Sequence, residues 1–238
     1  MLMDITLVIP AHNEERYIGA CLDAAIKNSR GKFKEIIVVD NVSTDKTAEV
    51  ARSRPGVRVV YEKQKGLTSA RQGGFEAATS EYLAYLDADT HITEKWFDVA
   101  ENVFAERPEI VSLSGPRRYF GAARYRLWIL NAMWATAPLA YPFVGYMILG
   151  GNFIAKRSAI AAIGGFDRSI EFYGEDTDLA RRLSKIGKVL FRMDFFVRSS
   201  ARRFENEGIL KTNIVYALNF IWPVMFGRPF TKVSQDVR

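Results

Sequence analysis

The sequence has few of the residues that build covalent cross-links and soft-metal sites. Its 238 residues include one cysteine, Cys21, and two histidines, His12 and His91. A single cysteine excludes an intrachain disulfide, and it excludes zinc or iron–sulfur centres held by several thiolates. Cys21 is therefore expected to be a small buried hydrophobic residue.

Two phosphate-binding motifs are also missing. No GxGxxG follows the first apolar run, and no GxxxxGK[ST] occurs anywhere in the sequence. These absences argue against dinucleotide-dependent redox chemistry and against P-loop phosphoryl transfer. The first residues, MLMDITLVIPAHNEE, contain an early aspartate and no small-residue cleavage site, so they do not read as a secretory signal. We expect a reducing, cytoplasmic setting.

Acidic residues are scarce in the last quarter of the chain. Residues 181–238 contain 12 basic and 4 acidic side chains, whereas the whole sequence has a net charge of only +6. A basic segment of this kind is typical of a surface that faces phosphates, an anionic membrane or nucleic acid, or of a solvated face.

The composition, 48% hydrophobic and 25% charged, is that of a folded globule and excludes disordered and collagen-like classes.

Hydrophobic patterning predicts an α/β fold with a mainly parallel sheet. Short β-branched runs alternate with stretches in which apolar residues lie three and four apart, the order of successive βαβ units. One such helix is marked by Ile18, Leu22, Ala25 and Ile26, and Ser43 or Thr44 could cap a second helix that runs through Val50. The strands are expected at Ile5–Pro10, Glu35–Asp40, Val57–Glu62, Tyr82–Asp87 and Ile110–Ser114.

No charged residue occurs in the 29 positions from Leu127 to Ala155. A run of this length could span a bilayer, but Pro138 and Pro142 would interrupt a helix near its middle. The alternatives are a buried core segment, a contact between subunits, or an apolar surface against membrane or lipid. A second uncharged run, Thr212–Gly227, is too short to span.

Asp87 and Asp89 follow an apolar strand in the sequence YLAYLDADT. Residues at i and i+2 of an extended chain point to the same face, and two carboxylates beside a core are costly unless a cation neutralises them. Mg²⁺ or Mn²⁺ suits such a pair, because these ions take carboxylate oxygens together with substrate phosphates. A polar turn, in which Asp89 caps a helix starting near Thr93, is the alternative.

A second acidic cluster lies in the sequence YGEDTDLARRL. Leu179, Leu183 and Ile186 mark the buried stripe of a helix, which places Glu175, Asp176 and Asp178 in its first turn. The helix dipole favours acids there whatever their function. The glycine-containing loop before the helix could also present a carboxylate as a general base.

Polar residues follow the first two expected strands. Asn13 and Glu14 come after the first strand, and Asp40 ends the second. Because the carboxyl ends of parallel strands meet at one edge of a sheet, these side chains are expected to converge on a nucleotide site. Asn13 and Glu14 could instead be a helix cap with its first-turn acid.

Together these motifs resemble the family-2 glycosyltransferases, which have the GT-A fold. The resemblance is carried by VIPAHNEE, IIVVDNVSTDKT, KGLTSARQGG, YLAYLDADT and GGFDRSIEFYGEDTDLARRL, in the family's order over roughly residues 4–190. It implies a single Rossmann-like GT-A domain over residues 1–205, with a nucleotide-sugar half (1–115) and an acceptor half (116–205). Residues 206–238 would form a helical, membrane-associated extension.

The resemblance also implies an inverting transfer from a UDP- or GDP-sugar, dependent on Mn²⁺ or Mg²⁺. Asp176 would be the general base, with Glu175 beside it. Asp89 would bind the metal ion, and Asp87 would contact the ribose or the metal. The donor nucleotide would be bound by Pro10, Ala11, Asn13, Glu14, Asp40, Arg71 and Asp87.

The sequence departs from the family pattern in two places. Gln72 stands where asparagine is common, and no histidine follows the base, although many members use one to complete the metal or diphosphate site. Arg202 and Arg203 are the candidates to neutralise the diphosphate in its place, and an exposed basic loop is the alternative. Without the glutamine and tryptophan of the QxxRW element, we do not expect processive transfer.

Other functions fit the sequence less well. A dehalogenase-like phosphatase motif, DxDx[TV], fails because His91 stands where threonine or valine is required. A sugar-nucleotide-binding or membrane-scaffold protein without turnover would not need the second acidic site. Nucleic acid is not expected as a partner, since no recognition motif accompanies the basic tail. The acceptor is expected to be a carbohydrate or a lipid-linked molecule, in cell-envelope polysaccharide or glycolipid synthesis. We also expect peripheral contact with the inner face of the membrane. A homo-oligomer is an alternative to that membrane contact.

Overall fold

The structure, a computed structural model, describes residues 3–170 and 174–208, together with Thr212, Val215, Leu218, Asn219 and Trp222. Its strands are β1 (Ile5–Ala11), β2 (Glu35–Asp40), β3 (Val57–Tyr61), β4 (Tyr82–Leu86), β5 (Thr90–Ile92), β6 (Ile110–Ser114), β7 (Arg117–Phe120), β8 (Asn152–Lys156), β9 (Lys188–Phe191) and β10 (Val197–Ser200). Its helices are α1 (Ile18–Ser29), α2 (Thr47–Arg52), α3 (Leu67–Ala77), α4 (Trp96–Glu106), α5 (Arg124–Met133), a 3₁₀ turn (Trp134–Thr136), α6 (Ala137–Val144), α7 (Arg157–Ala162), α8 (Glu175–Leu183) and α9 (Arg202–Glu207).

The strands form two sheets. The larger has seven strands in the order β3-β2-β1-β4-β8-β6-β9, and the smaller has the order β5-β10-β7. Strands β3, β2, β1 and β4 are parallel, whereas β8 runs antiparallel to β4 and β6. The five predicted strands correspond to β1, β2, β3, β4 and β6, so the prediction of a mainly parallel α/β fold is confirmed.

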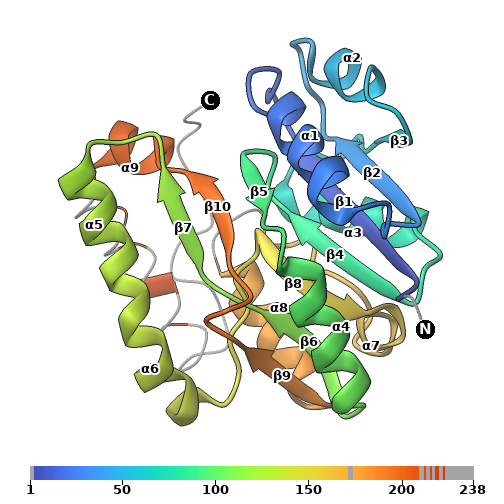
Figure 1. Cartoon of the computed structure of the whole chain (residues 1–238). Coiled ribbons are helices and arrows are strands. Elements are labelled where there is room, and N and C mark those ends of the chain that lie inside the picture. The colour runs from blue at the N-terminus through green and yellow to red at the C-terminus, as the bar shows by residue number, and fades with distance from the viewer. Residues whose placement is uncertain are drawn as a thin grey trace.

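Helices cover both faces of the large sheet (Figure 1). Alternate residues of β1 point to opposite faces, and every residue of this strand is buried. Leu7 and Ile9 lie in a cluster with residues of α1 and α4, and Val8 lies in a separate cluster with residues of α3, α7 and α8. Because both faces of β1 are covered, its sequence does not alternate and is apolar at every position except the buried Thr6.

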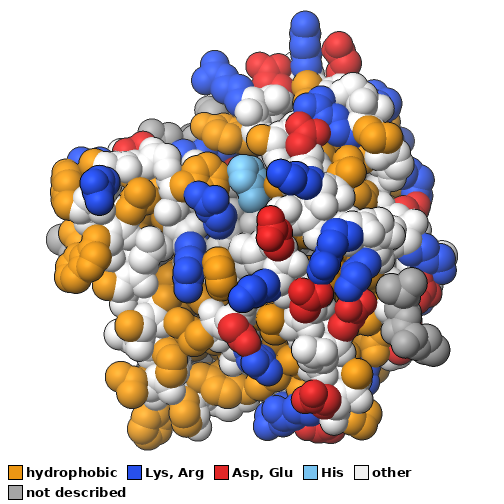
Figure 2. Space-filling model, in the orientation of Figure 1, with side chains coloured by type: hydrophobic (Ala, Val, Ile, Leu, Met, Phe, Trp, Pro, Cys, Tyr) orange, Lys and Arg blue, Asp and Glu red, His pale blue; other side chains and the backbone are white. Residues whose placement is uncertain are grey.

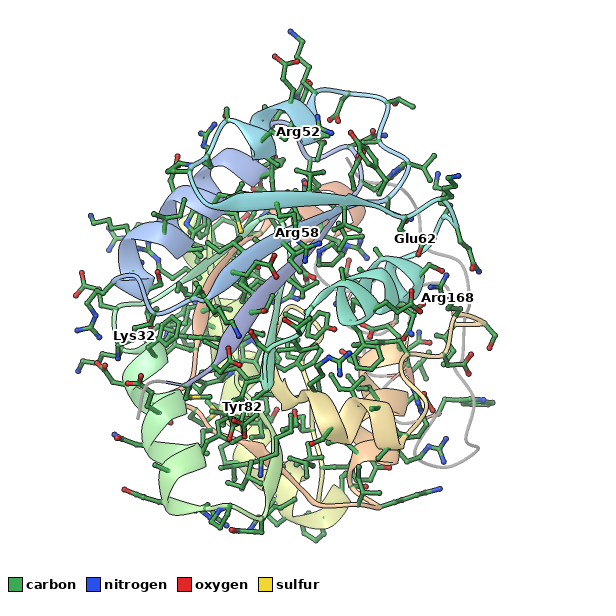
Figure 3. The ribbon with its side chains drawn as sticks, turned by 90° about the vertical axis from the view of Figure 1, so that its right-hand side faces the viewer. Lys32, Arg52, Arg58, Glu62, Tyr82 and Arg168 are labelled. Atoms are coloured by element: carbon green, nitrogen blue, oxygen red, sulfur yellow. The ribbon has the colours of Figure 1, made fainter. Side chains whose placement is uncertain are left out.

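Strand β3 is the edge of the sheet that faces the viewer in Figure 3. Its Arg58 pairs with Glu35 of β2, Nε to Oε1, at 2.6 Å. Arg168, from the segment that precedes α8, lies beside Glu62 in the same view, and Nη1 of Arg168 is 3.3 Å from Oε2 of Glu62. This ion pair attaches the segment before α8 to the end of β3.

The uncharged segment 127–155 divides into two parts with opposite environments. Residues Asn152–Ala155 of β8 are buried in the sheet, as a core segment should be. Over α5 and α6, however, large side chains face solvent, among them Trp128 at 74% and Phe143 at 91% exposure. Of the alternatives for this segment, a buried core is therefore wrong for α5 and α6. No helix in the part of the chain that the structure describes is long and apolar enough to cross a membrane.

Two local expectations are corrected. Neither Ser43 nor Thr44 caps α2; Asp45 Oδ1 instead accepts a hydrogen bond from the backbone N–H of Thr47 at 2.9 Å. Ile186 does not belong to the buried stripe of α8, since that helix ends at Leu183 and Ile186 is 46% exposed. Cys21 is fully buried, as expected.

The proposed C-terminal extension falls mostly outside the described residues. Helix α9 crosses the expected boundary between residues 205 and 206, and its Phe204 packs with Leu130 and Ala201 in a small cluster. Most of the run Thr212–Gly227 also lies outside the described part of the chain.

Adjacent glycines of α3 provide a test of how closely this helix packs on the sheet. A Cβ at Gly74 would overlap Cγ1 of Val8, a stiff β-branched side chain in the core, whereas a Cβ at Gly73 would meet Oε2 of the flexible Glu62 at 3.3 Å. We expect Gly74→Ala to lower the free energy of unfolding by about 1–3 kcal/mol, despite the better helix propensity of alanine. Gly73→Ala is the matched control and should be neutral or stabilising. Urea unfolding measures both, and equal effects of the two substitutions would contradict the close packing of α3 on β1.

Candidate active site

The polar residues predicted to converge do meet at one edge of the large sheet. Strands β2, β1 and β4 are neighbours, and Asp40, Glu14 and Asp87 lie at or just after their carboxyl ends. Asp40 and Glu14 are 4% and 5% exposed. Oδ1 of Asp40 is buried and makes no hydrogen bond within the described structure. An unpartnered buried carboxylate oxygen costs free energy, so this atom is suited to accept a hydrogen bond from a ligand.

The loops that follow β1 and β2 are joined by hydrogen bonds. Oδ1 of Asn13 accepts a hydrogen bond from the backbone N–H of Thr44 at 2.8 Å, and the backbone N–H of Asn13 donates to Oγ of Ser43 at 3.0 Å. Asn13 and Val42 both have a positive φ, 54° and 60°. A β-branched residue is rarely found there, so the backbone of Val42 is strained. The side chain of Asn13 thus serves to position this pair of loops.

Each aspartate of the DxD pair is matched by an arginine from a distant segment. Asp87 forms an ion pair with Arg117 at the start of β7, and Nη2 of Arg71 is 3.4 Å from its Oδ1. Nε of Arg202 is 3.1 Å from Oδ2 of Asp89. These ion pairs neutralise the two carboxylates that the sequence places beside each other.

Arg202 contacts acidic residues that follow two different strands, β1 and β4. Besides Asp89, it bonds Oε1 of Glu14 through Nη2 at 2.6 Å, and its guanidinium lies over the ring of Tyr17, 4.2 Å from the centroid. Burial by itself lowers the pKa of Arg202, but Glu14 and Asp89 raise it above its ordinary value. The guanidinium therefore stays charged at the site of the acidic residues.

A buried arginine joins the DxD pair to the second acidic cluster. Arg71 of α3 is 1% exposed and forms an ion pair with Glu175, the first residue of α8, while also approaching Asp87. The burial of Arg71 is compensated only because it has anions on two sides. It thereby fixes the start of α8 relative to the end of β4.

Gly150 and Gly151 lie against both ion pairs. A Cβ at Gly150 would overlap the side chains of Glu175 and Arg71, and a Cβ at Gly151 would overlap Arg117 and Asp87. In the sequence these glycines appear as interruptions of an apolar run. In the structure they allow the backbone before β8 to approach the charged groups closely.

The two acids at the start of α8 have different environments. Glu175 is buried, whereas Asp176 is partly exposed. Oδ1 of Asp176 accepts a hydrogen bond from the backbone N–H of Thr177 at 2.8 Å, and Oδ2 accepts one from that of Gly150 at 3.4 Å. Asp178 pairs with Arg181 and Arg182 of its own helix. Only Asp176 of these three combines access to solvent with a position beside the ion pairs.

Burial and neighbouring charges separate the pKa values of these carboxyls. Burial raises the pKa of Glu175 to about 7, although Arg71 opposes the shift, and the neighbouring Asp176 adds to it. Burial also raises the pKa of Asp176 above its ordinary value, against the effect of Arg71. Burial acts in the same direction on Asp87, but the charges of Arg117, Arg71 and Arg203 hold its pKa below the ordinary value.

The carboxylates of Asp87 and Asp89 fit a divalent cation that receives its remaining ligands from a substrate. The side chain of Asp87 is 28% exposed, so one of the two carboxylates is open to a ligand. Within the described residues, no group of three or more histidine, cysteine, aspartate or glutamate side chains is placed to hold a metal ion. Mg²⁺ is commonly coordinated by two carboxylates, with phosphate oxygens and water as its remaining ligands.

The sequence predicted most of these residues but missed Arg117. Its position directly after the fifth expected strand, in GPRRYF, was the only signal that could have indicated it. Arg203 is half-buried and contributes to the electrostatic environment of Asp87, and Pro10 and Ala11 are buried at the end of β1. The residues carried over from the resemblance thus lie around one sheet edge.

Comparison with known proteins identifies similar sequences. The model of the Glycosyl transferase family 2 matches residues 6–164, and that of the N-terminal domain of galactosyltransferase matches residues 132–206. Glycosyltransferase AglE of Haloferax volcanii is 34% identical over 100 residues, which cover 40% of this chain and 33% of AglE. Polypeptide N-acetylgalactosaminyltransferase 3 of Taeniopygia guttata is 31% identical over 187 residues, covering 65% of this chain and 30% of that protein. The chain spans about a third or less of the length of these relatives.

Solved structures share the fold at low identity. A mannosyltransferase of Pyrobaculum calidifontis, PcManGT, in complex with GDP-Man and Mn²⁺, has a TM-score of 0.71 and 18% identity, covering 94% of this chain and 65% of its own. Glucosyl-3-phosphoglycerate synthase of Mycobacterium tuberculosis, with Mn²⁺, UDP-Glc and phosphoglyceric acid, has a TM-score of 0.68 and 20% identity, covering 96% and 82%. These likenesses confirm the expected GT-A fold.

The contacts of Arg202 predict an effect on metal affinity. A guanidinium next to Asp89 opposes a second cation at the same carboxylate, so Arg202→Ala should raise the affinity for Mn²⁺ by about tenfold or more in the absence of nucleotide. Titration calorimetry with Mn²⁺ alone measures this. Arg198→Ala, an exposed residue of β10, is the matched control, and Asp89→Asn should abolish the binding. An unchanged affinity in Arg202→Ala would show that Arg202 and the metal ion do not share Asp89.

Proposed function

Because the chain belongs to the Glycosyl transferase family 2, we propose that it transfers a sugar from a nucleoside-diphosphate donor to an acceptor hydroxyl, or to a lipid phosphate, with inversion at the anomeric carbon. The observation that carries the proposal is the arrangement around Arg71. This residue pairs with Asp87, which follows β4, and with Glu175, the neighbour of Asp176 in the sequence, so one buried cation holds a donor-side group and the residue next to the candidate base. A UDP- or GDP-sugar is supported by the donors of PcManGT and glucosyl-3-phosphoglycerate synthase.

The donor nucleoside is proposed to lie against the carboxyl ends of β1 and β2. Pro10, Ala11 and Glu14 line the first strand end, and the unpartnered Oδ1 of Asp40 is available to a hydrogen-bond donor of the base or ribose. Arg71 and Asn13 would contribute indirectly: Arg71 by holding Asp87, and Asn13 by holding the β2–α2 loop. The mutual hydrogen bonds of the two loops reduce the reorganisation that binding requires.

The donor diphosphate is proposed to lie beside Asp87 and Asp89. When bound there, Mn²⁺ or Mg²⁺ would neutralise the negative charge of the leaving diphosphate. Arg117, Arg202 and Arg203 supply positive charge at the same place, and the first two are already held there by Asp87 and Asp89. Arginine binds phosphate oxygens in bidentate geometry, so these side chains could turn from the carboxylates to the diphosphate.

Asp176 is proposed as the general base. The acceptor oxygen forms a bond to the anomeric carbon as the bond from that carbon to the diphosphate oxygen breaks, and the acceptor proton passes to the carboxylate of Asp176. The raised pKa of Asp176 makes it a stronger base than an ordinary aspartate. Glu175 is buried against Arg71, so its role would be to position α8 and not to receive the proton.

The proposal is tested with a panel of UDP- and GDP-sugars. We expect nucleoside diphosphate to be released when Mn²⁺ or Mg²⁺ is present, and expect release to fall to background in EDTA. Release is measured by a coupled nucleotide assay, first as donor hydrolysis and then with carbohydrate and lipid-extract acceptors. Calorimetry on the same donors separates the outcomes. Tight donor binding without release with any acceptor would favour the alternative, a sugar-nucleotide-binding protein of the same fold.

The base assignment predicts a large effect of Asp176→Asn on turnover. We expect kcat to fall by roughly 10²–10⁴-fold with little change in donor affinity, because positioned base catalysis contributes that much. Asp178→Asn is the matched control; it lies on the same helix but pairs with Arg181 and Arg182, so kcat should be retained.

The same assignment fixes the direction of the pH dependence. The base must be ionised, so kcat of the unaltered chain should fall as the pH drops through the pKa of Asp176, which lies above the ordinary 3.8. Near-normal turnover of Asp176→Asn, or an acid limb that persists unchanged in it, would contradict the assignment.

A further inference from the structure

Large exposed hydrophobic side chains are concentrated on two consecutive helices. Nine such side chains are found among the described residues, and five of them lie on α5 and α6. They are Tyr125 (63% exposed), Trp128 (74%), Ile129 (40%), Leu139 (71%) and Phe143 (91%), and together they define the α5–α6 face. A concentration of exposed apolar side chains of this kind marks a binding surface more often than chance exposure does.

Hydrophobic side chains gather over α5 and α6 at the left and lower left of Figure 2. Scattered single hydrophobic residues need no explanation, but these five lie within 19 positions of the sequence. Neither helix turns these side chains toward the large sheet. Helix α5 is anchored instead through Leu130, which packs with Ala201 and Phe204.

The segment that carries this face has charge of one sign, although Nη1 of Arg126 on α5 lies 3.8 Å from Oε1 of Glu205 on the neighbouring α9. From residue 110 to residue 166 the sequence contains no aspartate or glutamate, although Arg117, Arg118, Arg124, Arg126, Lys156 and Arg157 fall in that range. Arg124 is exposed at the start of α5, and Arg118 is exposed on β7. The α5–α6 face therefore combines aromatic side chains with positive charge and carries no acidic residue of its own segment.

This combination matches a lipid bilayer surface better than it matches a second copy of the chain. Tryptophan and tyrosine favour the level of the lipid headgroups, and basic residues are attracted to anionic lipids. In an isologous dimer the same face would meet itself, which would bring arginine toward arginine with no acidic partner from this segment. Helices of 10 and 8 residues are too short to span but long enough to lie in the interface.

We propose that the α5–α6 face binds the surface of a membrane containing anionic phospholipids. Strand β7 links this face to the candidate active site, because it begins at Arg117, beside Asp87, and ends at Phe120, four residues before α5. The membrane would thus lie next to the site. A consequence that rests on the proposed function is that a lipid-linked acceptor could enter from the bilayer. Membrane binding itself is independent of transfer and is measured without a donor.

The test is flotation of the full chain with vesicles of phosphatidylcholine, with and without phosphatidylglycerol as a minor component. We expect binding to the anionic vesicles at low salt and weaker binding at high salt. Trp128→Ser and Phe143→Ser should each lower the affinity roughly tenfold or more, since each removes a large apolar side chain from the contact. Tyr61→Ser is the matched control; Tyr61 is 60% exposed on β3, at the edge strand of the large sheet.

A second measurement locates the contact. Phospholipids with brominated acyl chains should quench tryptophan fluorescence on binding, and Trp128→Phe should remove most of the quenched component while vesicle binding is retained. Unchanged circular dichroism and melting temperature show that the variants are folded, which is expected for substitutions at exposed positions.

Three results would overturn the proposal. The first is absence of binding to anionic vesicles at low salt. The second is binding that Trp128→Ser and Phe143→Ser leave unchanged, which would assign it to another basic part of the chain. The third is a dimer in solution that Phe143→Ser converts to a monomer without any effect of vesicles, which would make the face a subunit interface. None of these results bears on donor turnover, so the proposed function would stand or fall separately.

Discussion

The candidate active site depends on one buried cation. Arg71 is held between Glu175 and Asp87, and its guanidinium is almost completely removed from solvent. A single charge in such a place would be strongly destabilising, and so would the buried Glu175 without the arginine. The three groups are therefore mutually dependent. Their arrangement fixes α3, the end of β4 and the start of α8 relative to one another, and thereby positions Asp176.

The remaining charges follow the same principle at the rim of the site. Asp87 and Asp89 lie side by side and would repel each other, and arginines from β7 and α9 offset that repulsion. These arginines could change partners, because an anionic ligand can take the place of the carboxylate beside each of them. The close approach of Gly150 and Gly151 keeps this region compact, because any side chain there would occupy the space of the ion pairs. The site is thus organised by charge compensation, and the proposed donor would enter an arrangement already supplied with both signs.

Local sequence was sufficient for five of the ten strands that the structure describes. The apolar runs that became β1, β2, β3, β4 and β6 are bounded by turn-forming residues, so their positions were predictable from periodicity. The acids of α8 were also placed correctly in its first turn, because the leucine spacing fixes the helix register. The environment of α5 and α6 was not predictable, since an uncharged aromatic stretch is equally compatible with core and surface. Ile186 was misplaced for a related reason: its spacing continues the apolar stripe, but the helix has ended before it is reached. The roles of the candidate catalytic, donor and metal residues stay predictions.

The sequence by itself determined the α/β fold, the family resemblance, and the carboxylates from which a metal site and a base could be built. These features depend on residue type and short-range spacing, which the chain carries locally. The tertiary structure decided which cation compensates each acid. The hydrogen-bonded partners Arg71 and Asp87 are 16 residues apart, Arg117 and Asp87 are 30 apart, and Arg202 and Glu14 are 188 apart. It also decided that Glu175 is buried while Asp176 reaches solvent, and that the α5–α6 face is exposed. Burial and charge pairing arise from contacts between distant segments, so no local pattern of residues specifies them.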